Sequence, residues 1–300
     1  MIEVVVLGSS GSSPAKERQM PCVALRREGE VFLFDCGEGT QMQMLRYGVN
    51  AYRIKAIFVS HAHGDHVIGI AGLVRTLALS NRKDPLEIFV PKGQERIVRS
   101  LVAFDKAMIG YEVRITGVGS GKIYVGRGFH VRAFRLNHTI PCSGYSFEEE
   151  ERFRFDAKKA KRLGISGSMF SEIGKRGRLK IKGKVVSLKS VTSTVKGLKI
   201  VYAADSRPSK NTEKFAKDAD LLIHESSYTE EYRKLALERK HSTAKEAATV
   251  ALHARAKMLV LVHISTRFKT TEPLLIEASS VFKNTKVAHD GEIIKIGGIV

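Results

Sequence analysis

The stretch IFVSHAHGDHVIGIAGLVRTLAL, residues 57–79, decides the fold. It places His61, His63, Asp65 and His66 within six positions of a chain that has only 10 histidines. Crowded imidazoles and a carboxylate destabilise a protein unless a cation holds them together, and a metal ion is the usual cation. The run IFVS predicts a strand, HAHGDH a loop at its carboxyl end, and IGIAGLVRTLAL an apolar-periodic helix. We therefore expect a metal site at the end of a strand.

The same order, an apolar strand and then a polar residue, recurs along the chain. It places His138 at the end of FRLNH, Asp205 in VYAADS and His263 in LVHIS. Strand ends that meet at one edge of a sheet are where α/β folds place their sites. In HAHGDH, side chains two apart can bind one ion and the last two can bind a neighbour. A carboxylate that bridges the ions would hold them about 3.5–4 Å apart. Imidazole with carboxylate suits Zn²⁺, with Mn²⁺ or Fe²⁺ as alternatives.

The composition indicates a globular α/β protein with a polyanionic partner. The chain of 300 residues is 43% hydrophobic and 27% charged, which is enough apolar material for a sizeable core. Its 50 Lys and Arg against 31 Asp and Glu give a net charge of +19, which favours binding to nucleic acid first and to an anionic membrane second. No apolar run approaches the roughly 20 residues of a membrane span, and the start MIEVVVLGSS lacks the basic residues of a signal peptide. We expect a cytoplasmic protein with no membrane segment.

Most of the excess positive charge lies in one segment. Residues 152–199 contain 15 Lys and Arg against two acids, Asp156 and Glu172, a net charge of +13. Such a run is commonly a solvated charged face, but this one is almost unbalanced by acids. We therefore expect residues 148–199 to contact a phosphate backbone, which would make binding steeply dependent on salt.

Three further predictions concern local structure. Cys22, Cys36 and Cys142 are odd in number and include no CxxC pair, so we expect buried thiols. Residues 112–147 hold several β-type runs and are expected to form an antiparallel sheet. HSTAKEAATVALHARA predicts a helix capped by Ser242 or Thr243.

With HxHxDH and the isolated His138, Asp205 and His263 in place, the chain resembles the metallo-β-lactamase superfamily. Within it, the chain resembles the tRNase Z family over nearly its whole length. Further stretches match that family in order: FDCGEGTQMQML (34–45), VPKG (90–93), YAADSR (202–207), HESSY (224–228), HSTAKEAA (241–248) and HISTRF (263–268). It departs from the family at Ala204 and Ser206, where Gly and Thr are usual, and residues 164–168 read GISGS in place of a Gly-Pro motif.

The resemblance implies an α/β fold, an αββα sandwich that forms a single catalytic domain over residues 1–300. Residues 148–199 correspond to the family's inserted basic arm, a flexible exosite that binds tRNA. The implied activity is that of a zinc-dependent endoribonuclease with two Zn²⁺ per subunit. It would remove the 3′ trailer from precursor tRNA, leaving a tRNA 3′-hydroxyl and a trailer 5′-phosphate. The family also implies a homodimer.

The resemblance further implies roles for single residues. His61, His63 and His138 would bind one zinc and Asp65, His66 and His263 the other, with Asp205 bridging them. Asp65 could also accept a proton from the attacking water, and His241, paired with Glu225, would act as general acid. Contacts with RNA are expected from Arg267, Lys92 and Gly93 and, in the arm, from Lys158, Lys159, Lys161 and Arg162. Without the family, His241 would be a capping or surface residue; His130, His224, His253 and His289 are expected to be structural.

Three other readings of the sequence stay open. A thioesterase, lactonase or small phosphodiesterase of the same superfamily would share the metal ligands but has no use for the basic segment. A larger nuclease of the mRNA-end-processing type needs an additional domain. An RNA-binding protein with structural metals needs no general acid. The product formed from RNA separates these classes.

Overall fold

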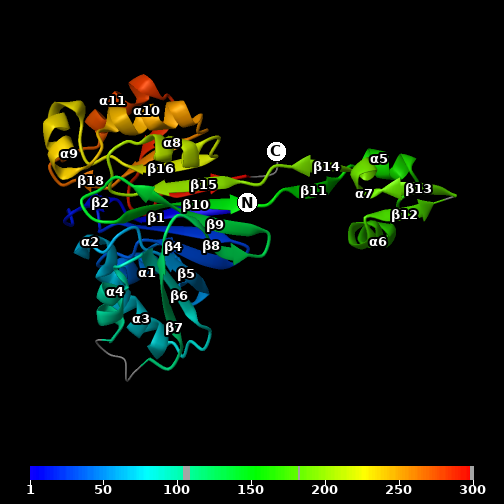
Figure 1. Ribbon diagram of the computed structural model, residues 1–300, viewed down its shortest axis with the longest axis horizontal. Helices are drawn as coiled ribbons and strands as arrows, with labels where there is room; N and C mark the ends of the chain where they lie inside the picture. The colour runs from blue at the N-terminus through cyan, green and yellow to red at the C-terminus, as the bar shows by residue number, and fades with distance from the viewer. Residues whose placement is uncertain (104–108, 182, 298–300) are drawn as a thin grey trace. The chain divides into compact units, whose positions relative to one another are not determined.

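The structure is a computed structural model that describes residues 1–103, 109–181 and 183–297 (Figure 1). The chain forms two compact units. Unit 1 comprises Met1–Gly126, His130–Glu148 and Lys199–Val300, and unit 2 comprises Arg127–Phe129 and Glu149–Leu198. Within the described ranges, no helix has the length and apolar character needed to cross a membrane.

The first sheet of unit 1 has seven strands and contains the strand that precedes the histidine cluster. In spatial order they are β20 (Ile293–Ile296), β1 (Ile2–Gly8), β3 (Cys22–Arg27), β4 (Glu30–Phe34), β5 (Ile54–Phe58), β6 (Leu86–Pro91) and β7 (Val113–Val118). β1, β3 and β4 pair antiparallel, whereas β4 to β7 run parallel. Parallel neighbours require crossover connections. These contain α1 (Thr40–Arg46), the 3-10 helix η1 (Ala51–Arg53), α2 (Gly64–Val67), α3 (Gly69–Leu79) and α4 (Glu95–Ala103).

The second sheet also has seven strands. Their order is β19 (Thr285–Val287), β17 (Leu259–Val262), β16 (Leu221–Glu225), β15 (Lys199–Ala203), β10 (Cys142–Glu149), β9 (Phe129–Leu136) and β8 (Gly121–Gly126). The neighbours β15, β16, β17 and β19 pair parallel. The crossovers between them contain α8 (Lys210–Ala216), the 3-10 helix η3 (Glu230–Tyr232), α9 (Arg233–Arg239), α10 (Ala244–Ala254) and α11 (Glu272–Val281). A short parallel pair, β2 (Ser10–Gly11) with β18 (Ile264–Ser265), lies outside both sheets.

The antiparallel sheet expected over residues 112–147 is wrong in part. β8, β9 and β10 are neighbours in the second sheet, but β7 pairs parallel with β6 in the first. Alternating apolar residues predict a strand, but they do not specify which strand pairs with it.

The two sheets pack face to face through aromatic side chains. The ring of Phe34 in β4 lies 6.1 Å from that of Tyr145 in β10 and 5.6 Å from that of Tyr202 in β15. Val31 and Leu33 point to the opposite face of the first sheet, since side chains alternate along a strand, and join the core beneath α1, α3 and α4. The order of layers is helices, sheet, sheet, helices (Figure 1), the expected αββα sandwich.

Two helices show why the chain folds this way next to the candidate site. In α3, Ile70, Leu73, Val74 and Leu77 recur on one face and are buried. α10 begins at a capping box, in which Thr243 caps the helix and the Glu246 side chain accepts from the Thr243 N–H. Of the two expected caps, Thr243 is therefore the one used.

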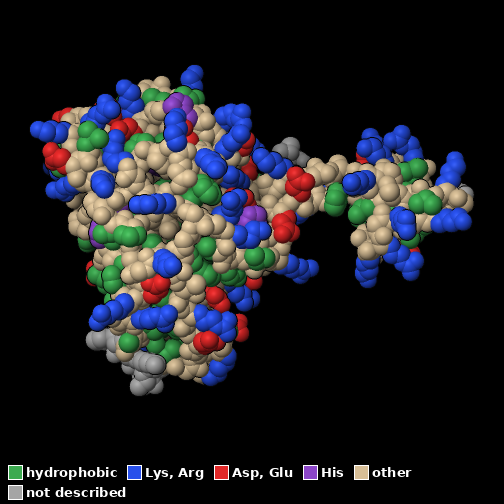
Figure 2. All heavy atoms as spheres, in the orientation of Figure 1, with side chains coloured by type: hydrophobic (Ala, Val, Ile, Leu, Met, Phe, Trp, Pro, Cys, Tyr) green, Lys and Arg blue, Asp and Glu red, His purple; other side chains and the backbone are tan. Residues whose placement is uncertain are grey.

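Unit 2 has its own small apolar core. Its strands are β11 (Arg152–Phe155) with β14 (Thr192–Val195), and β12 (Arg178–Ile181) with β13 (Lys184–Ser187); its helices are α5 (Ala157–Arg162), α6 (Met169–Arg176) and α7 (Leu188–Val191). The core contains Ala160, Ile165, Ile173, Val186 and Val191. Lys and Arg side chains cover much of the surface of this unit that Figure 2 shows. Its role in binding tRNA stays a prediction.

Candidate metal centre

The histidine cluster begins at His61, three residues after the end of β5. His61 is fully buried and His63 is partly exposed. The prediction of a loop over HAHGDH is wrong at its second half, because Asp65 and His66 lie in the short helix α2. The His66 N–H donates to the His63 carbonyl at 3.0 Å, which turns the chain back toward His61.

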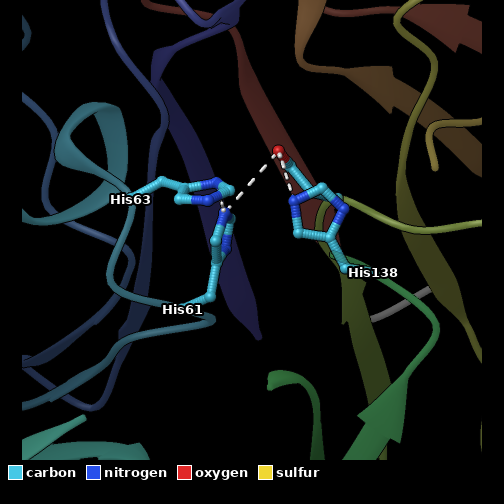
Figure 3. A group of neighbouring side chains, drawn as sticks. His61, His63 and His138 are labelled. Atoms are coloured by element: carbon cyan, nitrogen blue, oxygen red, sulfur yellow. Dashed lines mark hydrogen bonds and ion pairs between the residues drawn. The ribbon is translucent and has the colours of Figure 1, made fainter. Parts of the chain in front are cut away.

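One group of side chains comprises His61, His63, His138 and Asp205. One ligand atom from each lies within 4.8 Å of the others. Nε2 of His61 is 2.9 Å from Nδ1 of His63, and Oδ2 of Asp205 is 3.7 Å from Nε2 of His61 and 3.9 Å from Nε2 of His138. Figure 3 shows the rings of the three histidines facing a common point.

A second group comprises Asp65, His66 and His263. Oδ2 of Asp65 lies 3.4 Å from Nε2 of His66 and 3.5 Å from Nε2 of His263. Oδ1 of Asp205 faces the same two nitrogens, at 3.4 and 3.2 Å. Asp205 therefore presents one oxygen to each group, which is the arrangement that a bridging carboxylate requires.

The atoms at the centre of these groups fit a divalent metal. Four of these atoms, Nε2 of His66, His138 and His263 and Oδ1 of Asp205, are buried and have no hydrogen-bond partner among the residues that the structure describes. Leaving such an atom unsatisfied costs about 1–3 kcal/mol. A cation would satisfy all four, and a set of imidazoles and carboxylates suits Zn²⁺, Mn²⁺ or Fe²⁺.

The outer nitrogen of His66 is held by Asp35, a residue for which the sequence predicted no role. Nδ1 of His66 lies 2.8 Å from Oδ2 of Asp35, which also accepts from the Tyr202 hydroxyl at 2.7 Å and the Ser60 hydroxyl at 2.9 Å. With the Nδ1 proton donated to Asp35, Nε2 keeps its lone pair for a metal. The sequence pattern that selected Asp205 also applies to Asp35, since both residues directly follow an apolar run, VFLF for Asp35 and VYAA for Asp205.

Other candidate ligands are oriented in the same way. Nδ1 of His263 lies 2.9 Å from the hydroxyl of Ser227, and Nδ1 of His138 lies 3.3 Å from the Lys240 carbonyl. Ser227 was also missed. It lies within HESSY, but nothing in that motif shows that it contacts a histidine 36 residues later.

His241 and Glu225 form a buried pair beside the metal groups. Nδ1 of His241 is 3.0 Å from Oε1 of Glu225, which is fully buried and also accepts backbone N–H bonds from Ser206, Ser227 and Ser242. Burial lowers the pKa of His241, but the charge and hydrogen bond of Glu225, together with the charge of Asp205, raise it to about 9. Burial raises the pKa of Glu225, and His241 lowers it more, so that it falls overall. Because Glu225 holds Nδ1, the other nitrogen of His241 is free to donate a proton. His241 also lies close enough to Asp205 and His263 to form a third possible group of metal ligands with them.

The predicted RNA contacts lie in three places. Lys92 and His138 line a pocket of about 970 Å³, whereas Arg267, His241 and His263 line another of about 430 Å³. The Arg267 guanidinium lies 4.8 Å from the centre of the Tyr232 ring. Gly93, with φ +95°, is in the turn after β6 and donates its N–H to Glu95. The remaining predicted contacts, Lys158, Lys159, Lys161 and Arg162, are exposed on α5 of unit 2.

The other histidines and the cysteines lie outside these groups. The histidines have separate partners: His130 with Glu148, His224 with the Glu225 carbonyl, His253 with Glu213 and His289 with the Asp290 carbonyl. The three cysteines are free and buried, as expected. Burial raises the pKa of each thiol, which makes it unreactive.

Comparisons with known proteins agree with this geometry. A family model described as the Metallo-beta-lactamase superfamily matches residues 16–252. Ribonuclease Z of Methanosarcina acetivorans is 40% identical over 294 residues, which are 97% of this chain and 96% of that protein. Ribonuclease Z of Archaeoglobus fulgidus is 39% identical over 296 residues, with the same coverage of 97% and 96%. The crystal structure of human tRNase Z, short form, has a TM-score of 0.71 at 29% identity and covers 98% of this chain and 99% of that one.

Proposed function

Since this chain belongs to the metallo-β-lactamase superfamily and, within it, to the ribonuclease Z family, we propose that it removes the 3′ trailer from precursor tRNA. The observation that supports this most is the His241–Glu225 pair beside two sets of metal ligands that share Asp205. A ribose 3′-oxygen is a poor leaving group and needs a proton, which a thioester or an activated phosphodiester does not.

The proposal includes two zinc ions per subunit, with Mn²⁺ or Fe²⁺ as alternatives. His61, His63 and His138 would hold one ion and Asp65, His66 and His263 the other, with Asp205 between them. Bound there, the metals would lower the pKa of water and neutralise charge on the phosphoryl oxygens.

Two residues move protons in this mechanism. Burial raises the pKa of Asp65, but hydrogen bonds with His263 and His66 hold it well below its usual range, so Asp65 is ionised, as a metal ligand must be. A carboxylate with so low a pKa is a weak base, so Asp65 would accept a proton from the attacking water only where bound metals make that water acidic. His241, protonated at neutral pH, donates to the departing 3′-oxygen. The products are a tRNA 3′-hydroxyl and a trailer 5′-phosphate, because water attacks the phosphorus and the 2′-hydroxyl takes no part.

The proposed substrate agrees with the charge of the chain. Residues 152–199 carry a net charge of +13, and Lys92 and Arg267 line pockets that include candidate ligands. We propose that these residues, with Lys158, Lys159, Lys161 and Arg162, bind phosphates of the tRNA. A homodimer and a cytoplasmic location remain predictions.

The proposal is tested by offering the metal-loaded protein three substrates: a precursor tRNA with a 3′ trailer, a thioester and a small activated phosphodiester. We expect a single cut in the precursor tRNA that Asp205→Ala abolishes. If the wild-type protein leaves precursor tRNA intact and hydrolyses only a small substrate, the proposed function is wrong and the superfamily assignment stands.

A further inference from the structure

Arg207 occupies a central position beside the candidate site, although the mechanism above gives it no role. It lies two residues after Asp205, and its side chain is 14% exposed. Its Nη1 donates to the His241 carbonyl at 2.6 Å and to Oε2 of Glu246 at 2.7 Å, and its Nη2 bonds to Oε1 of Glu246. One guanidinium thus joins the chain at His241 to a carboxylate of α10.

Glu246 is itself fixed by the start of α10. Its Oε2 also accepts the backbone N–H of Thr243 at 3.0 Å, within the capping box. Thr243 in turn caps the helix by accepting the Glu246 N–H at 3.2 Å. The carboxylate that holds Arg207 is therefore anchored through Oε2 to the backbone of Thr243, and the two-pronged bond from the guanidinium restricts how far Arg207 can move.

The backbone next to Arg207 is also hydrogen-bonded to the segments that carry His138 and His241. The Arg207 N–H donates to the carbonyl of Asn137, the neighbour of His138, at 2.9 Å. The Ser242 hydroxyl donates to the Ser206 carbonyl at 2.6 Å. The segment that carries Asp205 is thereby bonded on one side to the His138 segment and on the other to the His241 segment.

From these contacts we infer that Arg207, held by Glu246, is a positioning residue that sets the distance between His241 and the phosphorus bound at the metal groups. This inference rests on the proposed function. Arginine is suited to the task because its planar fork reaches two acceptors in fixed directions. The lysine ammonium is a single point donor on a flexible stem, so it cannot hold the carbonyl and the carboxylate in the same geometry.

The inference is tested with two precursor tRNAs that differ in one atom. In one, the scissile bond has its natural 3′-oxygen; in the other, that bridging oxygen is replaced by sulfur, which departs without a proton. A residue that positions the general acid affects only the first substrate. A residue that merely supports the fold, or the metals, affects both.

For Arg207→Lys and Glu246→Gln we expect kcat on the oxygen substrate to fall about 10- to 100-fold, with KM nearly unchanged, because general acids contribute about 10²–10⁴-fold and small misplacements forfeit part of that. On the sulfur substrate, kcat should stay within about threefold of wild type. His241→Ala should show the same pattern more strongly, and adding Arg207→Lys to it should cost little more.

The matched control is the ion pair at the other end of the same helix. Arg255, just after α10, forms two bonds of 2.9 Å with Asp218. Asp218→Asn breaks this exposed pair and should leave both substrates unaffected. Metal content and circular dichroism verify that each variant is folded and loaded.

Equal losses on the oxygen and sulfur substrates, in folded and metal-loaded variants, would overturn the inference. So would wild-type kcat on the oxygen substrate for both variants. A wild-type protein that cuts neither precursor tRNA would instead overturn the proposed function. Should Glu246→Gln fail to fold, because it also weakens the cap of α10, Arg207→Lys decides the question alone.

Discussion

Glu225 controls the protonation of His241 at the scale of a single contact. Replacing Glu225 with Gln keeps its shape but removes the largest of the charges that raise the pKa of His241 to about 9. With this raised pKa, His241 is protonated below about pH 9 and loses its proton as the pH rises through that value. Without the carboxylate, burial lowers the pKa, so the alkaline fall of kcat should move to lower pH by more than about one unit. A pH–kcat profile measures this, and an unmoved alkaline limb contradicts the role of the pair.

Asp35 should control metal affinity although it does not face the metal groups. Asp35→Asn weakens the bond that fixes the His66 ring, and losing such an outer partner typically reduces metal affinity about 10- to 100-fold. Zinc titration against a competing chelator would measure the change. Asp84→Asn, which removes an exposed carboxylate paired only with Lys55 at 3.7 Å among the described ion pairs, is the control. Equal affinities in the two variants would show that Asp35 does not orient the ligand.

At the scale of elements, the order of strands and polar residues predicted much of the candidate site. It selected His138, Asp205 and His263 from widely separated positions, and the structure brings them together with His61, His63, Asp65 and His66. Asp205 and His263 follow β15 and β17, which run parallel in the second sheet and so end at the same edge, whereas His61 follows β5 in the first sheet and His138 follows β9. The pattern therefore predicts that each residue lies at the end of a strand, and the packing of the two sheets brings the strand ends together.

What the sequence could not predict depends on pairing between elements. The contact of Asp35 with His66 exists only because β4 and β5 are neighbours, and that of Ser227 with His263 arises in the same way between β16 and β17. The place of β7 in the first sheet follows from its pairing with β6, which local alternation does not specify. The short helix α2 was missed because a histidine- and glycine-rich hexapeptide has no helical periodicity.

The cap of α10 makes a prediction at this scale. Thr243→Ala removes the hydroxyl that accepts the Glu246 N–H and donates to Glu230, and the free energy of unfolding should fall by about 1 kcal/mol. Thr243→Ser keeps the hydroxyl and should cost much less. Urea unfolding of the two variants checks this, and indistinguishable midpoints would mean that the cap contributes little.

At the scale of the whole molecule, charge should determine affinity for RNA. Replacing Lys158, Lys159, Lys161 and Arg162 on α5 with Ala should raise KM for precursor tRNA and leave kcat nearly unchanged. If all four contact phosphates, the slope of log affinity against log salt should become shallower by about three. The control replaces four exposed lysines of unit 1, namely Lys214, Lys217, Lys234 and Lys283. The prediction is wrong if both sets change the salt slope equally or if neither does.

The position and chemistry of the cut test the central claim most directly. A precursor tRNA with a 3′ trailer would be cleaved in water enriched in oxygen-18, and both product ends would be identified by mass spectrometry. The account predicts one cut at the end of the mature tRNA sequence, a 3′-hydroxyl on the tRNA, and the heavy oxygen in the 5′-phosphate of the trailer, all absent with His66→Ala. A 2′,3′-cyclic phosphate on the tRNA, or scattered cuts that persist in His66→Ala, would contradict it.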